Sequence, residues 1–427
     1  MNLSADFELS IQDIEKIIIR EQTELAKLTR LRKYYEGTHN ILYKHNEDTS
    51  KPCNKLVFNF PKYITDNYTS YMVGNPITYS CADEDLMIEL QYAMDVNDAQ
   101  KVDSRICRNM NTTGYAYELH YVDANGMMRF CSIAPEDGIV VYDDTLEQNI
   151  LYFIRLVKNY DIDGNLTYTV EVYDKQMCRR FKANSLMSDL HPIGQNFHYY
   201  GKVPVVVYHD KSCFEDVLSL VDAYEKLASA ETDDYEAFVD SYMVLKGMTA
   251  DKDDIAQMKE NRVLLLDGDA DASYLIKQSD TTQIQTIKQD LITNIHKISA
   301  CPDFADQSFG TASGIAMKYK LLGFTNVSGG KLRVLRNGIM RRIELICSIL
   351  NLKGCQFDFT TVRPIFTPNL PVDIDGIVNE VNALRGLVSD ETLIAQLPFV
   401  ENVSAELEKL NEQNANTYSF DTQPETW

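Results

Sequence analysis

The sequence predicts an α+β protein made of several packed units, and three observations support this class. The chain has 427 residues, whereas a single domain usually has about 100 to 200. Its 44% hydrophobic and 24% charged residues are ordinary for a globular protein and allow a sizeable core. Short strand-like runs gather in residues 114–207, with helical patterns before and after them. A β-rich unit joined to several helices is therefore expected.

Two amphipathic helices are expected before the β-rich region. Between Ile11 and Leu31 apolar residues recur at intervals of three, four and seven, with charged residues between them, which is the period of a helix with one buried face. A second helix with an aromatic face is expected from Asn59 to Tyr71. It should end near the Gly74-Asn75-Pro76 sequence, because glycine and proline interrupt helices.

The β-rich region is expected to be antiparallel. Runs such as YAYELHYV, LYFIRLV and LTYTVEVYD are separated by turn residues, as in successive hairpins. The turn that starts at Asp161 (DIDGN) begins like a calcium-binding loop, but its glycine is not sixth and the twelfth residue is not Glu. A hairpin turn is the better interpretation.

The middle of the chain predicts two antiparallel helices that are joined by a small insert. The first is expected from Phe214 to Leu245, a stretch without Gly or Pro, and should stop at Gly247. The second carries isoleucine and leucine at helical spacing from Ile284 to Ile298. The insert, residues 250–278, is predicted to contain a helix over Asp253–Glu260 and strands over Val263–Leu266 and Tyr274–Ile276.

A long helix is expected from Ile315 to Leu350, after a loop over residues 303–313. Its Ser328-Gly329-Gly330 sequence predicts a kink or a break, because each glycine costs about 1 kcal/mol inside a helix. Further helical stretches are expected over Asp373–Leu384, from a cap at Ser389 to Leu397 and over Ser404–Glu412, before a disordered end.

Charge and cysteine usage limit the function classes. The net charge is -22, from 63 acidic and 41 basic residues, which argues against tight duplex binding, since such binders cluster Lys and Arg. No apolar run approaches the roughly 18 to 20 residues of a membrane span, and the N-terminus lacks a signal-peptide pattern. The nine scattered cysteines favour a reducing cytoplasm over a disulfide framework.

No catalytic, cofactor-binding or metal-binding residue is predicted. The sequence contains no phosphate-binding glycine loop, nucleophile elbow or zinc-protease motif. His191 and His198 lie in a loop-like stretch and are interpreted as surface residues. The acidic turn with Asp267, Asp269 and Asp271 has no accompanying His or Cys, so metal binding is not expected there.

One basic cluster stands out in this acidic chain. Its members are Lys331, Arg333, Arg336, Arg341 and Arg342, all on the second half of the predicted long helix. Such a cluster meets either DNA phosphate or the acidic residues of a neighbouring subunit. The acidic neighbour is the favoured interpretation.

Five stretches of the chain carry a family resemblance. They are YYEGTHNIL (34–42), NKLVFNFPKYITDNYTSYMVGNPITY (54–79), GYAYELHYVDANG (114–126), DAYEKLASAETDDYEAFVDSYMVLKG (222–247) and SGIAMKYKL (313–321). In order and spacing they resemble the portal proteins of tailed double-stranded DNA phages, of the type common in siphophages of Gram-positive hosts. The resemblance covers nearly the whole chain.

The resemblance implies a ring-forming portal fold with a β-rich wing, a two-helix stem, a small αβ clip, a long kinked helix and a short helical crown. It assigns the wing to 1–221, stem helices to 222–249 and 281–300, the clip to 250–280, the tunnel loop to 301–314, the long helix with its return to the wing to 315–369, the crown to 370–415 and a disordered tail to 416–427.

The resemblance also implies a function and partners. Portal subunits, usually twelve, form a homo-oligomeric ring at one capsid vertex of the virion, through which DNA is packaged and ejected without sequence specificity. The ring nucleates head assembly in the host cytoplasm and contacts the major capsid and scaffolding proteins, the large terminase subunit and the head-tail adaptor. ATP hydrolysis belongs to the terminase, so neither an enzyme activity, nor a cofactor, nor a membrane is expected.

Candidate site residues follow from the same resemblance. The tunnel loop would face DNA through Phe304, Gln307, Ser308, Phe309 and Thr311, although the two Phe rings alternatively pack between subunits and the loop alone reads as a linker. The stem would line the channel with Glu231, Asp234, Glu236 and Asp240, because an acidic wall repels phosphates. Phosphate or intersubunit contacts are expected at Lys318, Lys320, Lys331, Arg333 and Arg336, and terminase or intersubunit contacts of the clip at Asp253, Lys259, Arg262, Asp267 and Asp269.

Two other function classes were weighed. A different head structural protein, such as a head-tail adaptor, would typically be much shorter. A nucleic-acid-modifying enzyme of the phage head would need a carboxylate-metal or nucleophile constellation, and the sequence shows none.

Overall fold

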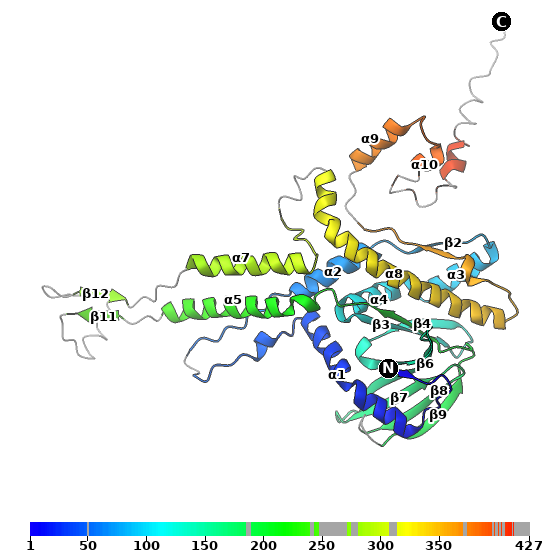
Figure 1. Ribbon diagram of the computed structural model, residues 1–427, viewed down its shortest axis with the longest axis horizontal. Coiled ribbons are helices and arrows are strands. Elements are labelled where there is room, and N and C mark those ends of the chain that lie inside the picture. Colours follow the sequence, from blue (N-terminus) through cyan, green and yellow to red (C-terminus); the bar gives the residue numbers. More distant parts are fainter. Residues whose placement is uncertain are drawn as a thin grey trace, which may run out of the picture. The chain divides into compact units, whose positions relative to one another are not determined.

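The computed structural model describes residues 1–48, 51–184, 189–239, 243–246, 271–274, 281–306, 314–369 and 374–394, with single residues and short stretches between 397 and 413 (Figure 1). The chain divides into two compact units. The first contains Met1–Asp306 and Lys320–Pro368, and the second contains Gln307–Tyr319 and Asn369–Trp427.

The predicted N-terminal helix is confirmed as α1 (Ile11–Tyr35). Ser10 caps it: its hydroxyl accepts from the Asp13 backbone N–H at 3.2 Å, and the Asp13 carboxylate accepts from the Ser10 N–H at 3.3 Å. The aromatic-faced helix is confirmed as α2 (Phe60–Val73), with Asn59 accepting from the Lys62 N–H. Most apolar positions that predict α1 are buried, from Ile14 to Leu31, but Ile11 is 39% exposed. In α2 the aromatic face is buried at Tyr68 and Tyr71.

The β-rich region is confirmed as antiparallel, in two sheets. Six strands pair in the order β1-β5-β6-β7-β8-β9 and three in the order β10-β3-β4. Only β1 pairs in parallel, with β5. The bounds are β1 Asn2–Leu3, β3 Tyr115–Val122, β4 Met128–Ile133, β5 Gly138–Asp143, β6 Ile150–Tyr160, β7 Leu166–Tyr173, β8 Met177–Ala183, β9 His191–Phe197 and β10 Val205–His209.

One part of this region was predicted wrongly. Residues from His191 to Phe197 read as a loop but form β9, the edge strand of the larger sheet, paired with β8. Every residue of β9 is exposed, so the strand has no buried face and its sequence shows no alternation. Pro192 and Gly194 fit an edge position, where ladder bonds are missing on one side.

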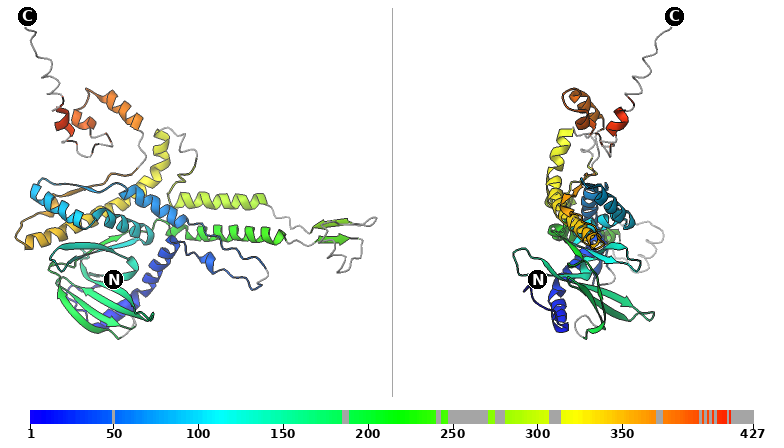
Figure 2. Two further views of the ribbon diagram at one scale, coloured as in Figure 1. Left: turned by 180° about the vertical axis from the view of Figure 1, so that it is seen from behind. Right: turned by 90° about the vertical axis from the view of Figure 1, so that its right-hand side faces the viewer.

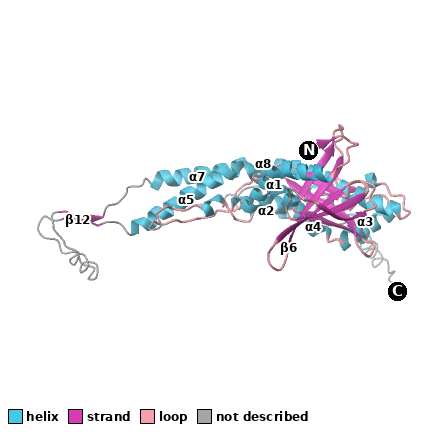
Figure 3. Ribbon diagram, turned by 90° about the horizontal axis from the view of Figure 1, so that it is seen from below, coloured by secondary structure: helices cyan, strands magenta, loops and turns pink. Residues whose placement is uncertain are grey.

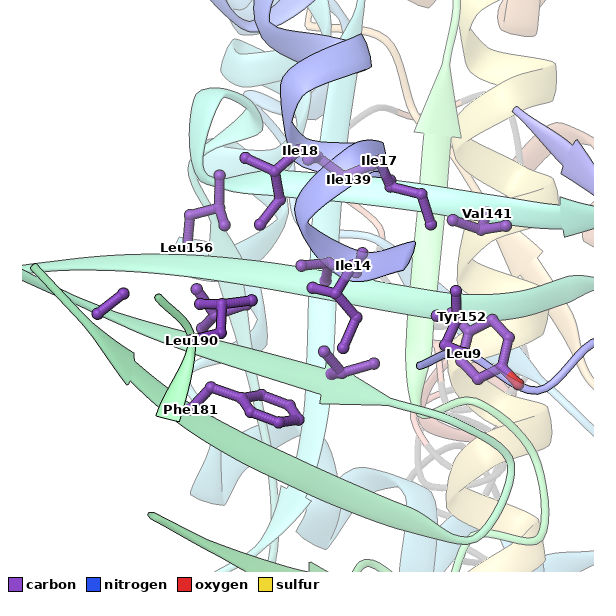
Figure 4. Packing of buried hydrophobic residues seen from close by; sticks show 14 residues of the cluster. Leu9, Ile14, Ile17, Ile18, Ile139, Val141, Tyr152, Leu156, Phe181 and Leu190 are labelled. Carbon is purple, nitrogen blue, oxygen red and sulfur yellow. The ribbon is translucent and has the colours of Figure 1, made fainter. Parts of the chain in front are cut away.

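The main core lies between α1 and the inner face of the six-stranded sheet (Figure 4). Ile14, Ile17 and Ile18 of α1 pack with Ile139 and Val141 of β5. These positions recur every three or four residues in the helix and every second residue in the strand, which explains why both patterns were readable.

Two helices precede β3 in a segment for which the sequence analysis assigns no element. They are α3 (Glu84–Val96) and α4 (Ala99–Thr113). Gly114 ends α4 at φ 84°, and a Cβ there would lie 2.6 Å from the Asp210 carbonyl oxygen. Glycine is therefore required for the close approach of the β10 end to this turn. Nearby, β2 (Thr78–Ser80) pairs with β13 (Arg363–Ile365).

The two predicted rods are present as α5 (Leu218–Val239) and α7 (Thr281–Ile298). They run side by side in Figures 1 and 3. The first helix does not continue to Leu245 as predicted, because Met243–Lys246 forms β11, which pairs antiparallel with β12 (Asp271–Tyr274). This pairing overrides the helical pattern, since β12 comes from much later in the chain. The rest of the predicted insert lies outside the described residues.

The long predicted helix is α8 (Gly314–Leu352), which continues through Ser328-Gly329-Gly330. The glycines do not break it, because the helix buries Ser328, Lys331, Leu335 and Ile339 at helical spacing around them. In the second unit, α9 (Ile374–Leu384) confirms the expected helix. The Ser389 hydroxyl accepts from the Thr392 N–H at 3.4 Å before α10 (Asp390–Ile394).

Short 3-10 helices complete the described elements: η1 Asn40–Tyr43, η2 Pro135–Asp137, η3 Glu215–Val217 and η5 Phe359–Thr361. Figure 2 shows α1, α5 and α7 from two further sides. Among the helices in the described ranges, none combines the length and apolarity that a bilayer crossing requires.

Candidate functional site

One face of α5 carries polar residues that hold a distant segment. Asp222, Glu225, Ser229, Asp233 and Glu236 follow one another at intervals of three, four, four and three, which places them on a single helix face. Residues 39–58 lie against this face; we call this segment, described except for 49 and 50, the strap. The strap contributes backbone N–H groups and the side chains of His39, Asn40, Lys44 and Asn54.

The outer half of this contact centres on Asp233. Its Oδ2 accepts from the Lys44 ammonium at 2.5 Å, and its Oδ1 accepts from the Asn54 backbone N–H at 2.6 Å and side-chain amide at 2.9 Å. Burial opposes the carboxylate charge, but the Lys44 ammonium and the Asn54 donors outweigh it and lower the pKa of Asp233. The same Asn54 amide donates to Glu236 at 3.0 Å.

The inner half centres on a buried His39–Glu225 pair. The Nδ1 of His39 lies 2.6 Å from Glu225 Oε1, and its Nε2 lies 2.8 Å from the Tyr34 carbonyl oxygen. Both side chains of the pair are fully buried. Since a carboxylate and a carbonyl are both acceptors, each ring nitrogen donates and the imidazole carries a positive charge. Burial opposes this charge, but Glu225 outweighs it and raises the pKa of His39 above its ordinary 6.5.

A different face of α5 contacts α7. The Glu231 carboxylate accepts from the Lys288 ammonium at 2.8 Å and from the Gln285 amide at 3.0 Å. The Lys288 ammonium also lies 6.0 Å from the centre of the Tyr224 ring, a cation-π distance. These contacts tie the two rods together.

The predicted channel-lining acids therefore do not share one environment. Glu231 bonds to α7 and Glu236 bonds to the strap. Glu236 and Asp234 are both exposed. Asp240 lies outside the described residues. The contact face of Asp222, Glu225 and Asp233 was not predicted. The signal that could have revealed it is helical spacing: Glu225 lies three residues after Asp222, and Asp233 lies eight residues after Glu225.

Of the predicted tunnel-loop residues, only Phe304 lies in the described part. Its backbone N–H donates to the Tyr63 hydroxyl at 2.9 Å, and its ring lies 5.8 Å from that of Phe324 in an edge-to-face arrangement. It remains 37% exposed. Gln307, Ser308, Phe309 and Thr311 lie outside the described residues, as do the clip positions Asp253, Lys259, Arg262, Asp267 and Asp269.

The predicted basic cluster is not one surface patch. Lys331 is buried, with its ammonium 2.5 Å from the Lys211 carbonyl oxygen and 3.6 Å from the Asp210 carboxylate. Its expected phosphate or intersubunit contact is therefore wrong: the contact lies within the chain. Arg333 and Arg336 are exposed, the latter 5.6 Å from the Phe366 ring centre. Arg341 bonds to Glu344. Lys318 and Lys320 are exposed on the first turns of α8.

Arg342, the last member of that cluster, is fully buried. Its Nε and Nη2 donate to the two oxygens of Glu118 at 2.8 Å each, and Nη2 also donates to Asp103 at 2.6 Å. Tyr208 and His120 lie within hydrogen-bond distance of the same Glu118 carboxylate. Burial raises the pKa of Glu118, but Arg342 and His120 outweigh it and lower the value to about 2.

This buried network joins three elements that lie far apart in the sequence. Arg342 comes from α8, Asp103 from α4 and Glu118 from β3. Burial raises the pKa of Asp103, and Arg342 offsets only part of that rise. Arg342 lies eleven residues after Lys331 and seven after Leu335, so helical spacing already placed it on the buried face. Among the described residues, no three His, Cys, Asp or Glu side chains are grouped so that they could hold a metal ion.

Comparison with known proteins identifies the class to which this architecture belongs. A family model, "Phage portal protein, SPP1 Gp6-like", matches residues 14–418. The chain is therefore a phage portal protein. Within that class it belongs to the SPP1 Gp6-like family. The portal protein of Bacillus phage SPP1 is 24% identical over 416 residues, which cover 90% of this chain and 80% of that protein.

Solved structures of gene transfer agent particles contain chains that resemble this one more remotely. A chain from the virion of a native gene transfer agent particle has a TM-score of 0.46 at 12% identity, covering 90% of this chain and 99% of that one. A chain from the neck of a native gene transfer agent particle, computed with C12 symmetry, has a TM-score of 0.44 at 10% identity. That match covers 80% of this chain and 89% of the other.

Proposed function

We propose that this portal protein forms a closed ring of about twelve copies at one capsid vertex and conducts double-stranded DNA through its axis during packaging and ejection. The family match over residues 14–418 carries the proposal. The ring has no catalytic role of its own, and the large terminase subunit supplies ATP hydrolysis.

The paired rods α5 and α7 are the proposed stem of the ring. Contacts of Glu231 with Lys288 and Gln285 hold the rods together. The exposed carboxylates of Asp234 and Glu236 are the described acids that we assign to the channel wall. Like charge keeps phosphates from adhering to it. Asp240 stays a proposed member of the wall.

Phe304 marks the start of the proposed tunnel loop. The Tyr63 hydroxyl and the Phe324 ring fix its backbone and one ring edge, so the loop leaves a firmly held position. We propose that Gln307, Ser308, Phe309 and Thr311 approach the DNA from there, and that Lys318, Lys320, Arg333 and Arg336 contact DNA phosphate or acidic groups of the adjacent subunit.

The proposed partners occupy other parts of the ring. The large terminase subunit docks on the clip, residues 250–280, through Asp253, Lys259, Arg262, Asp267 and Asp269. The major capsid and scaffolding proteins contact the ring as the head assembles in the host cytoplasm, and a head-tail adaptor follows after packaging. The finished virion retains the ring at its vertex.

Electron microscopy of the purified chain tests the proposal. Rings of about a dozen copies with an open axial channel are expected. Monodisperse monomers at high protein concentration would contradict it. Heads assembled with an Asp234→Lys ring should package DNA more slowly than heads with an Asp234→Asn ring, because a lysine retains phosphate whereas an amide does not.

A further inference from the structure

A pocket at the junction of α1, α4 and β4 contains two arginines that form no hydrogen bond or ion pair with the described part of the chain. It has a volume of about 350 Å³ and is lined by Arg32, Glu36, Arg105, Arg108, Asn109 and Glu136, among others. Arg105 and Arg108 are three residues apart on α4 and therefore share one helix face. Neither has a hydrogen bond or an ion pair with any residue in the described ranges.

Arg32, which also lines this pocket, is an arginine whose hydrogen bonds lie within the chain. Its guanidinium donates to the Glu136 carboxylate at 3.3 and 3.4 Å and to the Asn109 side-chain oxygen at 2.8 Å. Asn109 in turn donates to the Ser132 hydroxyl at 3.2 Å. Arg32 is thus paired with two side chains that also line the pocket, Glu136 and Asn109. It lies beside Arg105 and Arg108, for which the described residues offer no such partner.

Arg108 carries the second observation. Its Nε is buried and has no acceptor in the described part of the chain. A buried donor without a partner is destabilising, and a guanidinium cannot avoid this penalty by losing its proton. An external anion that reaches this guanidinium would remove the penalty.

We propose that this pocket receives a carboxylate side chain of a second copy of the chain and so forms part of the contact between adjacent subunits. The inference rests on the ring of the proposed function. A copy with a net charge of -22 presents mainly carboxylates to its neighbour, and arginine pairs with carboxylates through two parallel hydrogen bonds.

DNA phosphate fits the same pocket less well. Glu36 and Glu136 line it beside the arginines, and these charges repel the closely spaced phosphates of a duplex. Its volume matches one or two side chains, whereas a duplex binds to an extended basic surface. The acidic side chain of a neighbour is therefore the occupant that the charges favour.

Charge reversal tests the pocket in the full-length protein. Arg108→Glu is expected to lower the fraction of protein in rings about tenfold at low salt, because it places like charges in contact. Lys101→Glu is the matched control: it lies on the same helix, makes the same change of charge and is 62% exposed with a weak pair at 3.8 Å. Rings should form normally with the control. Equal ring fractions for the two variants would overturn the inference.

A cross-linking experiment identifies the occupant and does not depend on loss of assembly. Arg108→Lys keeps the positive charge and provides an amine that carbodiimide joins to a neighbouring carboxylate. Rings formed from mixed nitrogen-14 and nitrogen-15 subunits should give cross-links of hybrid isotope composition at position 108. Cross-links within single-isotope chains alone, or none, would overturn the inference.

Two further outcomes distinguish a failure of this inference from a failure of the proposed ring-forming function. If the unmodified protein forms no rings, the proposed function fails and the inference fails with it. If Arg108→Glu leaves the rings intact but lowers DNA retention in filled heads, the pocket binds phosphate, and the carboxylate assignment is wrong.

Discussion

Two buried histidine-glutamate pairs in this protein look alike but carry different charges. His39 lies 2.6 Å from Glu225 at the root of α5, and His120 lies 2.8 Å from Glu118 inside the wing. All four side chains are at most 2% exposed. The pKa of His39 is nevertheless raised above 6.5 and that of His120 is lowered below it.

Arg342 explains the difference. Glu118 already receives two hydrogen bonds from this guanidinium, so a second cation beside it gains little. Burial is the largest effect on His120, and Arg342 and Arg341 add to it, so its pKa falls. Glu225 accepts only from His39 and the Phe58 backbone N–H among the described residues, and nearby Asp222 adds negative charge. His39 is the cation that Glu225 requires.

The comparison teaches that the two regions are held by different kinds of charge. Glu118 and Asp103 are held by the Arg342 guanidinium, which stays charged at every accessible pH. The strap is held to α5 by an imidazolium whose charge is lost at alkaline pH. Of these two contacts, only the one between the strap and α5 is therefore expected to weaken as the pH becomes alkaline.

The largest effect is expected for Arg342→Met. The substitution leaves Asp103 and Glu118 buried without their cation, and breaking a buried ion pair in this way costs about 3 to 5 kcal/mol. We expect a corresponding fall in the free energy of unfolding, measured by urea denaturation at pH 7. The adjacent Arg341→Met removes a partly exposed pair with Glu344 and should cost about 1 kcal/mol or less. Equal losses for the two variants would contradict the assigned network.

An intermediate effect is expected for His39→Gln, and it depends on pH. Because the folded pKa of His39 is raised, its contribution is fully present below the unfolded value of 6.5 and is lost as pH rises through the folded pKa. The wild-type protein should therefore lose stability as the pH increases from 6.5 towards 9. The variant should lose about 1 to 3 kcal/mol at pH 6 and show a flatter profile over this range.

His120→Gln is the matched control for that profile. Since the folded pKa of His120 is lowered, this histidine is neutral in both the folded and unfolded states above pH 6.5, and its stabilising contribution is lost only as pH falls below that value. The control variant should keep the alkaline loss of stability seen in the wild type. Thermal unfolding midpoints measured at half-unit pH steps distinguish the three proteins; a wild-type profile that is flat above pH 6.5 would contradict the charge assigned to His39.

The sequence predicted those helices and strands that are encoded by the spacing of residues close together in the chain. The helices α1, α7 and α8 follow from apolar spacing, and α5 follows from a stretch without Gly or Pro. The hairpins of the β-rich region follow from alternation and turn residues. The prediction of a helix over Met243–Lys246 was wrong, because these residues form a strand that pairs with β12. Of the kink or break expected at Gly329 and Gly330, the break is absent, because α8 continues with buried residues on both sides of the glycines.

The candidate site was less predictable, because charge alone does not reveal its partner. Lys331 and Arg342 were grouped with surface arginines, although their spacing from Leu335 placed them on the buried face of α8. Glu231 and Glu236 were interpreted as part of a channel wall, but Glu231 bonds to Lys288 and Glu236 bonds to Asn54 of the strap. Asn54 lies 182 positions before Glu236 in the chain, and no local pattern encodes that contact.

The smallest effect is expected where the strap is half exposed. Lys44 and Asp233 form a pair at 2.5 Å with side chains 28% and 16% exposed. A double-mutant cycle with Lys44→Met and Asp233→Asn should give a coupling free energy of about 0.5 to 1 kcal/mol, because solvent screens much of the attraction. Denaturation of the four proteins at low ionic strength measures it.

Lys62 and Asp66 provide the reference cycle. They form an ion pair at positions i and i+4 of α2, with side chains 53% and 41% exposed, for which about 0.3 to 0.5 kcal/mol is expected. The coupling of Lys44 with Asp233 should be larger and should fall less when 1 M salt is added, since its carboxylate is less exposed to solvent. If the two couplings are equal and fall equally with salt, the strap is held at its inner half alone, by His39 and Glu225.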